Sequence, residues 1–137
     1  MTSTAAATIA QRHEPTVSDI CAVAARAADA KSGENTVILD VGDMLGITDA
    51  FVITSGRNGR QVRTIVDEVE LQVRESGASS PLRVEGLDDA RWVLMDYGDF
   101  LVHVFVDEAR EFYDLEHLWV DARRIPWAPV KPASEAS

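Results

Sequence analysis

AFVITSGRNGRQVRTIVDEVELQVRESG, residues 50–77, is the stretch of sequence that decides the fold. It opens with a short run rich in β-branched residues, which is typical of a strand. After the glycine turn at residues 56–59 the apolar residues recur at helical spacing; they are Val62, Ile65, Val66, Val69 and Val73. The stretch therefore predicts a strand at residues 50–55 and an amphipathic helix that ends at residues 76–77.

The neighbouring sequence extends this unit into a sheet. Residues 36–41 form another β-branched run on the N-terminal side, and Pro81 precedes a strand at residues 82–85. Strand, helix and strand thus form a crossover at residues 50–85, which we expect to be right-handed and to leave its two strands parallel.

A hairpin follows the crossover. Residues 92–96 and 100–106 predict two strands, and the tight turn between them contains Tyr97 and Gly98, so the strands are expected to pair antiparallel. Alternation along the second strand places His103 on its less buried face. With parallel and antiparallel pairs in one sheet, the predicted fold class is α/β, with a mixed sheet of about five strands and flanking helices.

Two further flanking helices are expected. Thr16 and Asp19 resemble a capping box for a helix at residues 17–31, on whose apolar stripe Cys21 is expected to be a buried structural thiol. A last helix is expected at residues 108–119, with Asp107 as its cap.

The terminal segments differ from the rest in composition. Residues 1–13 are small and polar and predict a disordered leader, and residues 122–137 predict a proline-containing tail. The folded domain is therefore expected to span residues 14–121.

Length and charge exclude several classes of protein. A chain of 137 residues with 46% apolar and 26% charged residues predicts one globular domain. Its net charge of -10 disfavours broad nucleic-acid binding, and residues 86–121 alone carry ten acidic and two basic side chains. One cysteine closes no internal disulfide, and no apolar run could cross a bilayer. We expect a reducing, aqueous compartment.

Candidate chemical sites are few. One cysteine and three histidines in different elements give no zinc-ligand spacing, and no nucleophile and base can be paired. Residues 54–60 join a strand to a helix where amides can hold a phosphate, but without a P-loop lysine a plain glycine turn is favoured. Asp96 and Asp99 can meet a divalent ion with Asp107 or Glu108, although acids beside a turn are also typical of a solvated hairpin.

Three strings of the sequence resemble a known family. WVLMDYGDFLVHVF at residues 92–105 and REFYDLEHLW at residues 110–119 closely resemble the ribosomal silencing factors, also called Iojap-like proteins. ITDAFVITSGRNGRQV at residues 47–62 resembles another diagnostic stretch of that family. The resemblance implies an α/β domain related in fold to nucleotidyltransferases but without their activity.

The resemblance also implies a function. The family binds the large ribosomal subunit, through its ribosomal protein number fourteen, and prevents the small subunit from joining, which damps translation when nutrients are scarce. It implies a cytoplasmic repressor with no catalytic residue, metal, cofactor or membrane partner and no direct nucleic-acid role, and it is compatible with a two-fold homodimer. The partner-binding residues that it implies are Trp92, Asp96, Tyr97, Gly98, Asp99, Arg110, Tyr113 and Glu116.

Two alternatives remain open at the level of the sequence. A metal-dependent nucleotide-binding or nucleotidyltransferase-like enzyme would use Ser55 with Asp96 and Asp99, although the Gly-Ser order of the transferases is reversed here. An RNA-binding module would use the glycine turn and three nearby cations, which are Arg57, Arg60 and Arg63.

Overall fold

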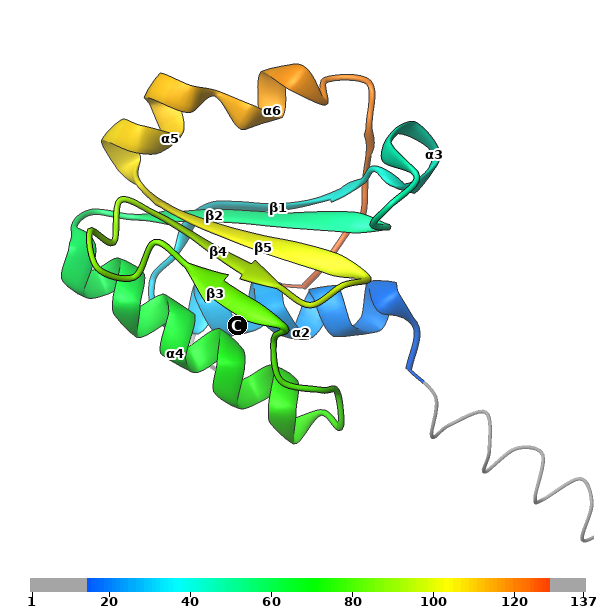
Figure 1. Ribbon diagram of the computed structural model, residues 1–137, viewed down its shortest axis with the longest axis horizontal. Helices are drawn as coiled ribbons and strands as arrows, with labels where there is room; N and C mark the ends of the chain where they lie inside the picture. Colours follow the sequence, from blue (N-terminus) through cyan, green and yellow to red (C-terminus); the bar gives the residue numbers. More distant parts are fainter. Residues whose placement is uncertain (1–14, 129–137) are drawn as a thin grey trace, which may run out of the picture.

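A six-stranded mixed sheet lies between two layers of helices in this computed structural model, which describes residues 15–128 (Figure 1). The expected leader at residues 1–13 and the end of the expected tail, residues 129–137, lie outside the described residues. The helices are α2 (Val17–Ala30), α3 (Gly42–Leu45), α4 (Gly59–Glu75), α5 (Asp107–Tyr113) and α6 (Leu115–Leu118). The strands are β1 (Glu34–Asp40), β2 (Ala50–Gly56), β3 (Arg83–Glu85), β4 (Trp92–Asp96), β5 (Phe100–Val106) and β6 (Arg123–Arg124).

The sheet has the strand order β3-β4-β5-β2-β1-β6. β2 and β5 are parallel neighbours, and the other neighbouring pairs are antiparallel. The predicted mixed α/β sheet is therefore confirmed, with six strands instead of about five among the described residues. β3 runs in the same direction as β2, as the crossover predicts, but β4 and β5 lie between them.

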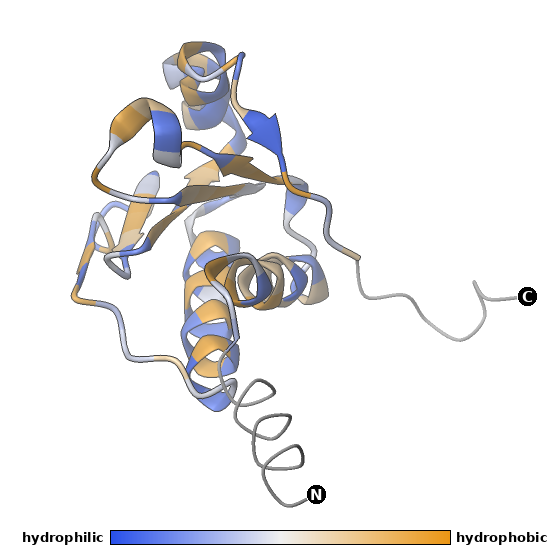
Figure 2. Cartoon of the chain, turned by 90° about the vertical axis from the view of Figure 1, so that its right-hand side faces the viewer, coloured by the Kyte–Doolittle hydropathy of each residue, from blue (hydrophilic) through white to orange (hydrophobic). Residues whose placement is uncertain are grey.

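The main hydrophobic core lies between the sheet and the pair α2 and α4, which cover the same face (Figure 1). α4 buries the five residues of its predicted stripe, and α2 buries Cys21 with four alanines. Figure 2 shows hydrophobic residues gathered in the strands between the helical layers. Burial raises the pKa of the Cys21 thiol to about 12, so it stays protonated and unreactive. Cys21 is the structural thiol that the sequence predicts.

The sequence predicts the start of the first helix correctly, but it does not predict the form of the last one. At α2 the capping box is confirmed: Thr16 Oγ1 accepts from the Asp19 amide, and the Asp19 carboxylate accepts from the Thr16 amide, both at 3.1 Å. The single helix expected at residues 108–119 is wrong, because Asp114 adopts a left-handed conformation (φ 47°) that ends α5 and begins α6. Asp107 is the first residue of α5 and makes no side-chain cap.

Part of the expected tail, residues 123–127, bonds to strand β1 at the edge of the sheet. β6 pairs antiparallel with β1, and beyond it the Ile125 amide donates to the Ile38 carbonyl at 2.9 Å. Trp127 Nε1 then donates to the Thr36 carbonyl at 3.1 Å. The sheet therefore continues past the boundary expected at residue 121. Within residues 15–128 we find no helix with the length and apolar character needed to span a bilayer.

Candidate functional site

The outer half of the sheet, on the side of α5 and α6, presents partly exposed side chains from two neighbouring strands. Trp92, Leu94 and Asp96 alternate along β4, and Leu101 of β5 lies opposite Asp96, so all four point to this side. Tyr113 of α5, which is 50% exposed, borders them. We call these five residues the β4–β5 face.

Trp92 is held from several directions although part of it is exposed. Its ring stacks on Phe105 with centroids 4.9 Å apart, and Tyr113 lies against it at 4.7 Å. Its indole Nε1 donates a hydrogen bond to Nδ1 of His103 at 3.1 Å. Trp92 is therefore an aromatic side chain with little rotational freedom, of the kind that anchors interfaces.

His103 lies beneath this face and is more buried than the sequence predicts. It is only 5% exposed, whereas the alternation of its strand placed it on the less buried side. The reason is the second helical layer: the His103 ring meets Phe51 edge-on at 4.9 Å, and Phe51 is in turn covered by Trp119 just after α6. Burial lowers the pKa of His103 to about 4, so its imidazole is neutral at physiological pH.

The hairpin turn divides its residues between the two sides of the sheet. Asp96 accepts from the Gly98 amide at 2.8 Å and pairs with Arg83 at 3.3 Å, and Gly98 has a positive φ (85°), which a glycine adopts without strain. Tyr97 stacks on Phe100, on the α4 side, and burial raises the pKa of its phenol to about 12. Asp99 is exposed at the tip.

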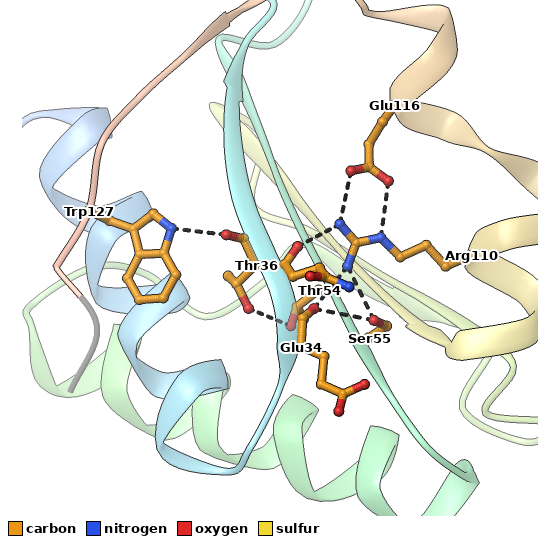
Figure 3. A network of polar contacts seen from close by, with 8 residues as sticks. Glu34, Thr36, Thr54, Ser55, Arg110, Glu116 and Trp127 are labelled. Carbon is orange, nitrogen blue, oxygen red and sulfur yellow. Dashed lines mark hydrogen bonds and ion pairs between the residues drawn. The ribbon is translucent and has the colours of Figure 1, made fainter. Parts of the chain in front are cut away.

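Arg110 and Glu116 form an internal ion pair instead of an exposed one (Figure 3). Arg110 is 8% exposed, and its Nε and Nη2 donate to the two Glu116 oxygens at 3.0 Å each. The other donors reach the Glu34 carbonyl at 2.9 Å, the Asn35 carbonyl at 2.6 Å and Ser55 Oγ at 3.2 Å. All five N–H groups of the guanidinium are therefore bonded. This arrangement, the Arg110 clasp, ties α5 and α6 to β1 and β2.

The clasp also sets the ionisation of Glu116. Hydrogen bonds from Arg110, together with its charge, hold the pKa of the Glu116 carboxyl below its ordinary value, against the opposing effect of burial. Ser55, at the centre of the clasp, lies in line with Phe105 and Trp92 across β2, β5 and β4, two strands away from the tryptophan. Arg110 and Glu116 therefore lie apart from the β4–β5 face.

The residues of the enzyme alternative do not converge. Ser55 pairs with Phe105 near one end of the parallel strands, whereas Asp99 precedes Phe100 at the other end. At roughly 3.3 Å per residue, five residues of strand separate these ends by about 17 Å. Within the described residues no group of three metal-binding side chains is close enough to hold an ion.

The glycine turn before α4 is closed by its own side chains. Asn58 Oδ1 accepts from the Gln61 amide at 2.9 Å, and Gln61 Oε1 accepts from the Arg57 amide at 2.7 Å. Arg63 donates to the carbonyls of Leu87 and Asp88. The turn is thus a helix cap, and its three cations, Arg57, Arg60 and Arg63, are all exposed.

The segment at residues 107–121, beside the β4–β5 face, is acidic, whereas Arg83 and Arg91 are exposed near β3 and β4. The only basic group of α5 is Arg110, which is buried, and α6 has His117 alone. The exposed acids along this segment are Asp107, Glu108, Glu111, Asp114 and Asp121. Exposed apolar side chains interrupt them, namely Phe112, Tyr113, Leu118 and Val120. Apolar anchors within an acidic rim suit a partner with a basic surface.

Sequence reasoning missed Leu94, Leu101 and the bond between Trp92 and His103. The alternation of Trp92, Leu94 and Asp96 was a usable signal for one shared face. No comparable signal existed for the buried state of Arg110, because its carbonyl partners are more than seventy positions away along the chain.

Comparison with known proteins identifies related sequences. The model of a family described as ribosomal silencing factor during starvation matches residues 14–137. The ribosomal silencing factor RsfS of Bacillus subtilis is 42% identical over 103 residues, which cover 75% of this chain and 86% of the relative. A mouse protein named mitochondrial assembly of ribosomal large subunit protein 1 is 31% identical over 91 residues, covering 65% of this chain and 40% of the relative.

The fold is shared with a protein of known structure. A crystal structure of a protein from Chromobacterium violaceum superposes with a TM-score of 0.74 at 28% identity, covering 90% of this chain and all of the other. The bacterial relatives carry the name of a silencing factor and not of an enzyme.

Proposed function

Because this chain belongs to the ribosomal silencing factor family, we propose that it is a translational repressor that binds the large ribosomal subunit through that subunit's ribosomal protein number fourteen. Bound there, it occupies space that the small subunit needs and so prevents the two from joining. Repression of this kind acts in the cytoplasm when nutrients are limiting. Family membership is the observation that carries the proposal.

A steric repressor needs a docking surface and no reacting groups. The β4–β5 face supports this role, because Trp92 is rigidly held there and partly exposed. Central aromatic anchors of this type contribute most of the binding free energy in protein interfaces. We place the partner contact at Trp92, Asp96 and Tyr113, continuing to the hairpin turn at residues 97–99.

Arg110 and Glu116 act in this proposal through the fold. The clasp fixes α5 at its junction with α6, and α5 carries Tyr113 against Trp92. Loss of the clasp would displace a border of the β4–β5 face without removing a direct contact.

Charge supports a protein partner over RNA. Net charge of -10 repels the phosphates of ribosomal RNA, and exposed acids line α5 beside the β4–β5 face. A basic ribosomal protein surface would attract this side of the molecule and orient it during encounter.

Replacement of Asp99 by alanine tests the charged rim. Asp99 is exposed at the hairpin tip, so Asp99→Ala should weaken binding to isolated large subunits chiefly at low salt, by about two- to fivefold, and hardly at high salt. Binding is measured by co-sedimentation at two ionic strengths. Equal weakening at both would assign Asp99 a role other than long-range attraction.

The enzyme alternative predicts turnover, and we expect none. Purified protein with magnesium should hydrolyse or transfer no nucleoside triphosphate, because Ser55 lies at the far end of the strands from Asp96 and Asp99. Turnover is followed by release of labelled phosphate. Activity that disappears in the Asp96→Ala, Asp99→Ala protein would favour the enzyme over the repressor.

We also propose that the free protein self-associates as a two-fold dimer. Large apolar side chains are exposed on α5, on α6 and at Leu82 beside β3, and such surfaces favour self-association. Sedimentation at high micromolar concentration should show a species heavier than the 15.0 kDa monomer. A single monomeric species would exclude the dimer.

The deciding experiment for the function is co-sedimentation with isolated subunits. We expect binding to the large subunit, no binding to the small subunit, and inhibition of subunit joining in a reconstituted assay. Binding to the small subunit alone would overturn the proposal.

A further inference from the structure

His103 is the one nearly buried polar side chain among the rings beneath the β4–β5 face. It is flanked by Phe51 at 4.9 Å, by Phe105 at 6.2 Å and by Trp92 at 6.0 Å. A phenylalanine would fill such an aromatic site with a similar volume and no polar atom. The presence of an imidazole therefore calls for a role of its nitrogens.

Only one imidazole nitrogen has a protein partner in the described part of the chain. Nδ1 accepts the Trp92 indole N–H at 3.1 Å, so in the neutral ring the proton is on Nε2. Nε2 is buried and makes no hydrogen bond with residues 15–128. A buried donor without an acceptor destabilises the folded state, so the ring is retained at a cost in stability.

The bond to Nδ1 decides how Trp92 is presented. Trp92 lies opposite Phe105, and His103 lies opposite Leu94, so the bond crosses diagonally between β4 and β5. Phe105 and Tyr113 hold the ring against the sheet, but stacking alone does not distinguish between the two flipped orientations of an indole. The hydrogen bond selects one of them, with the N–H turned inward. Trp92 then offers a partner only an apolar ring surface.

We propose that His103 is a positioning residue of the docking surface, which fixes the orientation of Trp92 before the partner binds. The proposal rests on the function proposed above, because it assumes that Trp92 is the anchor of that contact. Pre-organisation of this kind raises affinity by removing the entropy cost of ordering a side chain on binding.

Two substitutions at position 103 separate orientation from stability. His103→Phe keeps the aromatic volume and removes both the acceptor of the Trp92 N–H and the unpaired Nε2 donor. With the indole N–H free to turn to solvent, this variant should melt close to the wild type. His103→Asn places a carbonyl oxygen near the position of Nδ1 but leaves a cavity, so it should melt lower. If His103 orients Trp92, the order is reversed for binding to large subunits: the Asn variant stays close to wild type, and the Phe variant binds about five- to tenfold more weakly.

The indole N–H resonance of Trp92 gives a readout in the free protein. It is assigned by its disappearance in Trp92→Phe. In wild type and in His103→Asn it should exchange slowly with solvent, and in His103→Phe it should shift and exchange faster. If His103 had a structural role alone, the variants would rank in binding affinity as they rank in melting temperature.

A double-mutant cycle keeps the test valid if one variant is poorly folded. In a Trp92→Phe background, which has no indole donor, His103→Phe should change binding less than twofold. Leu71→Ala, at an exposed position on α4 in the opposite layer, is the matched control.

His103→Phe that binds as tightly as wild type, with an unchanged Trp92 resonance, overturns the positioning role while leaving the docking surface intact. Wild-type protein that fails to bind large subunits overturns the proposed function itself.

Discussion

Trp92→Ala is expected to remain folded and to lose binding to isolated large subunits by about thirtyfold or more, since removing a central aromatic anchor costs on the order of 2 kcal/mol. The variant should also no longer block subunit joining. The reason is geometric: Trp92 is the only side chain of the β4–β5 face that is both partly exposed and fixed by a hydrogen bond and two ring contacts.

Folding must be measured beside binding, because Trp92 also packs on the sheet. Trp92 is only partly buried, and β4 has the short β3 on its outer side, so we expect the truncation to cost less than the roughly 3 to 5 kcal/mol of a fully buried tryptophan. A thermal melt of Trp92→Ala with a cooperative transition establishes that it is folded. Trp92→Phe, which keeps the ring contacts, should lose less binding.

The control for this experiment is Leu71→Ala on α4, which removes an exposed apolar side chain from the opposite layer. Folded Trp92→Ala that co-sediments like Leu71→Ala would show that the contact lies elsewhere on the molecule.

The sheet could be predicted from the sequence because its signals are local. The strands at residues 92–96 and 100–106 have the predicted bounds, and α4 buries the predicted stripe. Alternation and helical period act between near neighbours, so a single sequence reveals them. The break at Asp114 was not predicted, because the apolar residues keep their helical spacing on both sides of it. A hydrogen bond from Arg110 to Glu116 spans the break.

Long-range pairings account for most of what the sequence did not reveal. β6 pairs with β1, and Arg123 meets Asp40 across 83 positions of the chain. His103 is buried because α5 and α6 return over a face of β5 whose alternation gave no sign of a second layer. The sequence indicates the candidate site only as a region of the chain, and which of its residues point outward depends on these long-range contacts.

The second large effect that we expect is a loss of stability when Arg110 is replaced. Arg110→Met keeps an unbranched apolar stem and removes the guanidinium, leaving the Glu116 carboxylate and the Asn35 carbonyl without the donors that Arg110 supplies and the Glu34 carbonyl with the Ser55 hydroxyl alone. Breaking a buried ion pair on one side typically costs about 3 to 5 kcal/mol. For a domain of this size we expect the melting temperature to fall by about 10 °C or more.

A matched pair of substitutions shows whether burial causes this effect. Arg123 pairs with Asp40 at the same 3.0 Å as Arg110 with Glu116, but the Arg123 side chain is 70% exposed and that of Arg110 is 9% exposed. Arg123→Met should therefore change stability by less than about 1 kcal/mol. Equal melting temperatures for the two variants would mean that the clasp contributes no more than a surface pair.

The pH dependence of stability provides an independent check on the same clasp. The pKa of Glu116 is lowered in the folded state, so its ionised form contributes stability above its ordinary pKa, and this contribution is lost as the pH falls through the lowered value. Wild type should thus lose stability on acidification below about pH 4.5 more steeply than Arg110→Met, in which the main cause of the lowered pKa is gone and only the smaller effect of the Arg124 charge still lowers it. Because the clasp holds α5, and α5 holds Tyr113 against Trp92, Arg110→Met should also weaken large-subunit binding where the domain is still folded. Parallel acid curves for the two proteins would instead assign the lowered pKa, and the docking of α5, to groups other than Arg110.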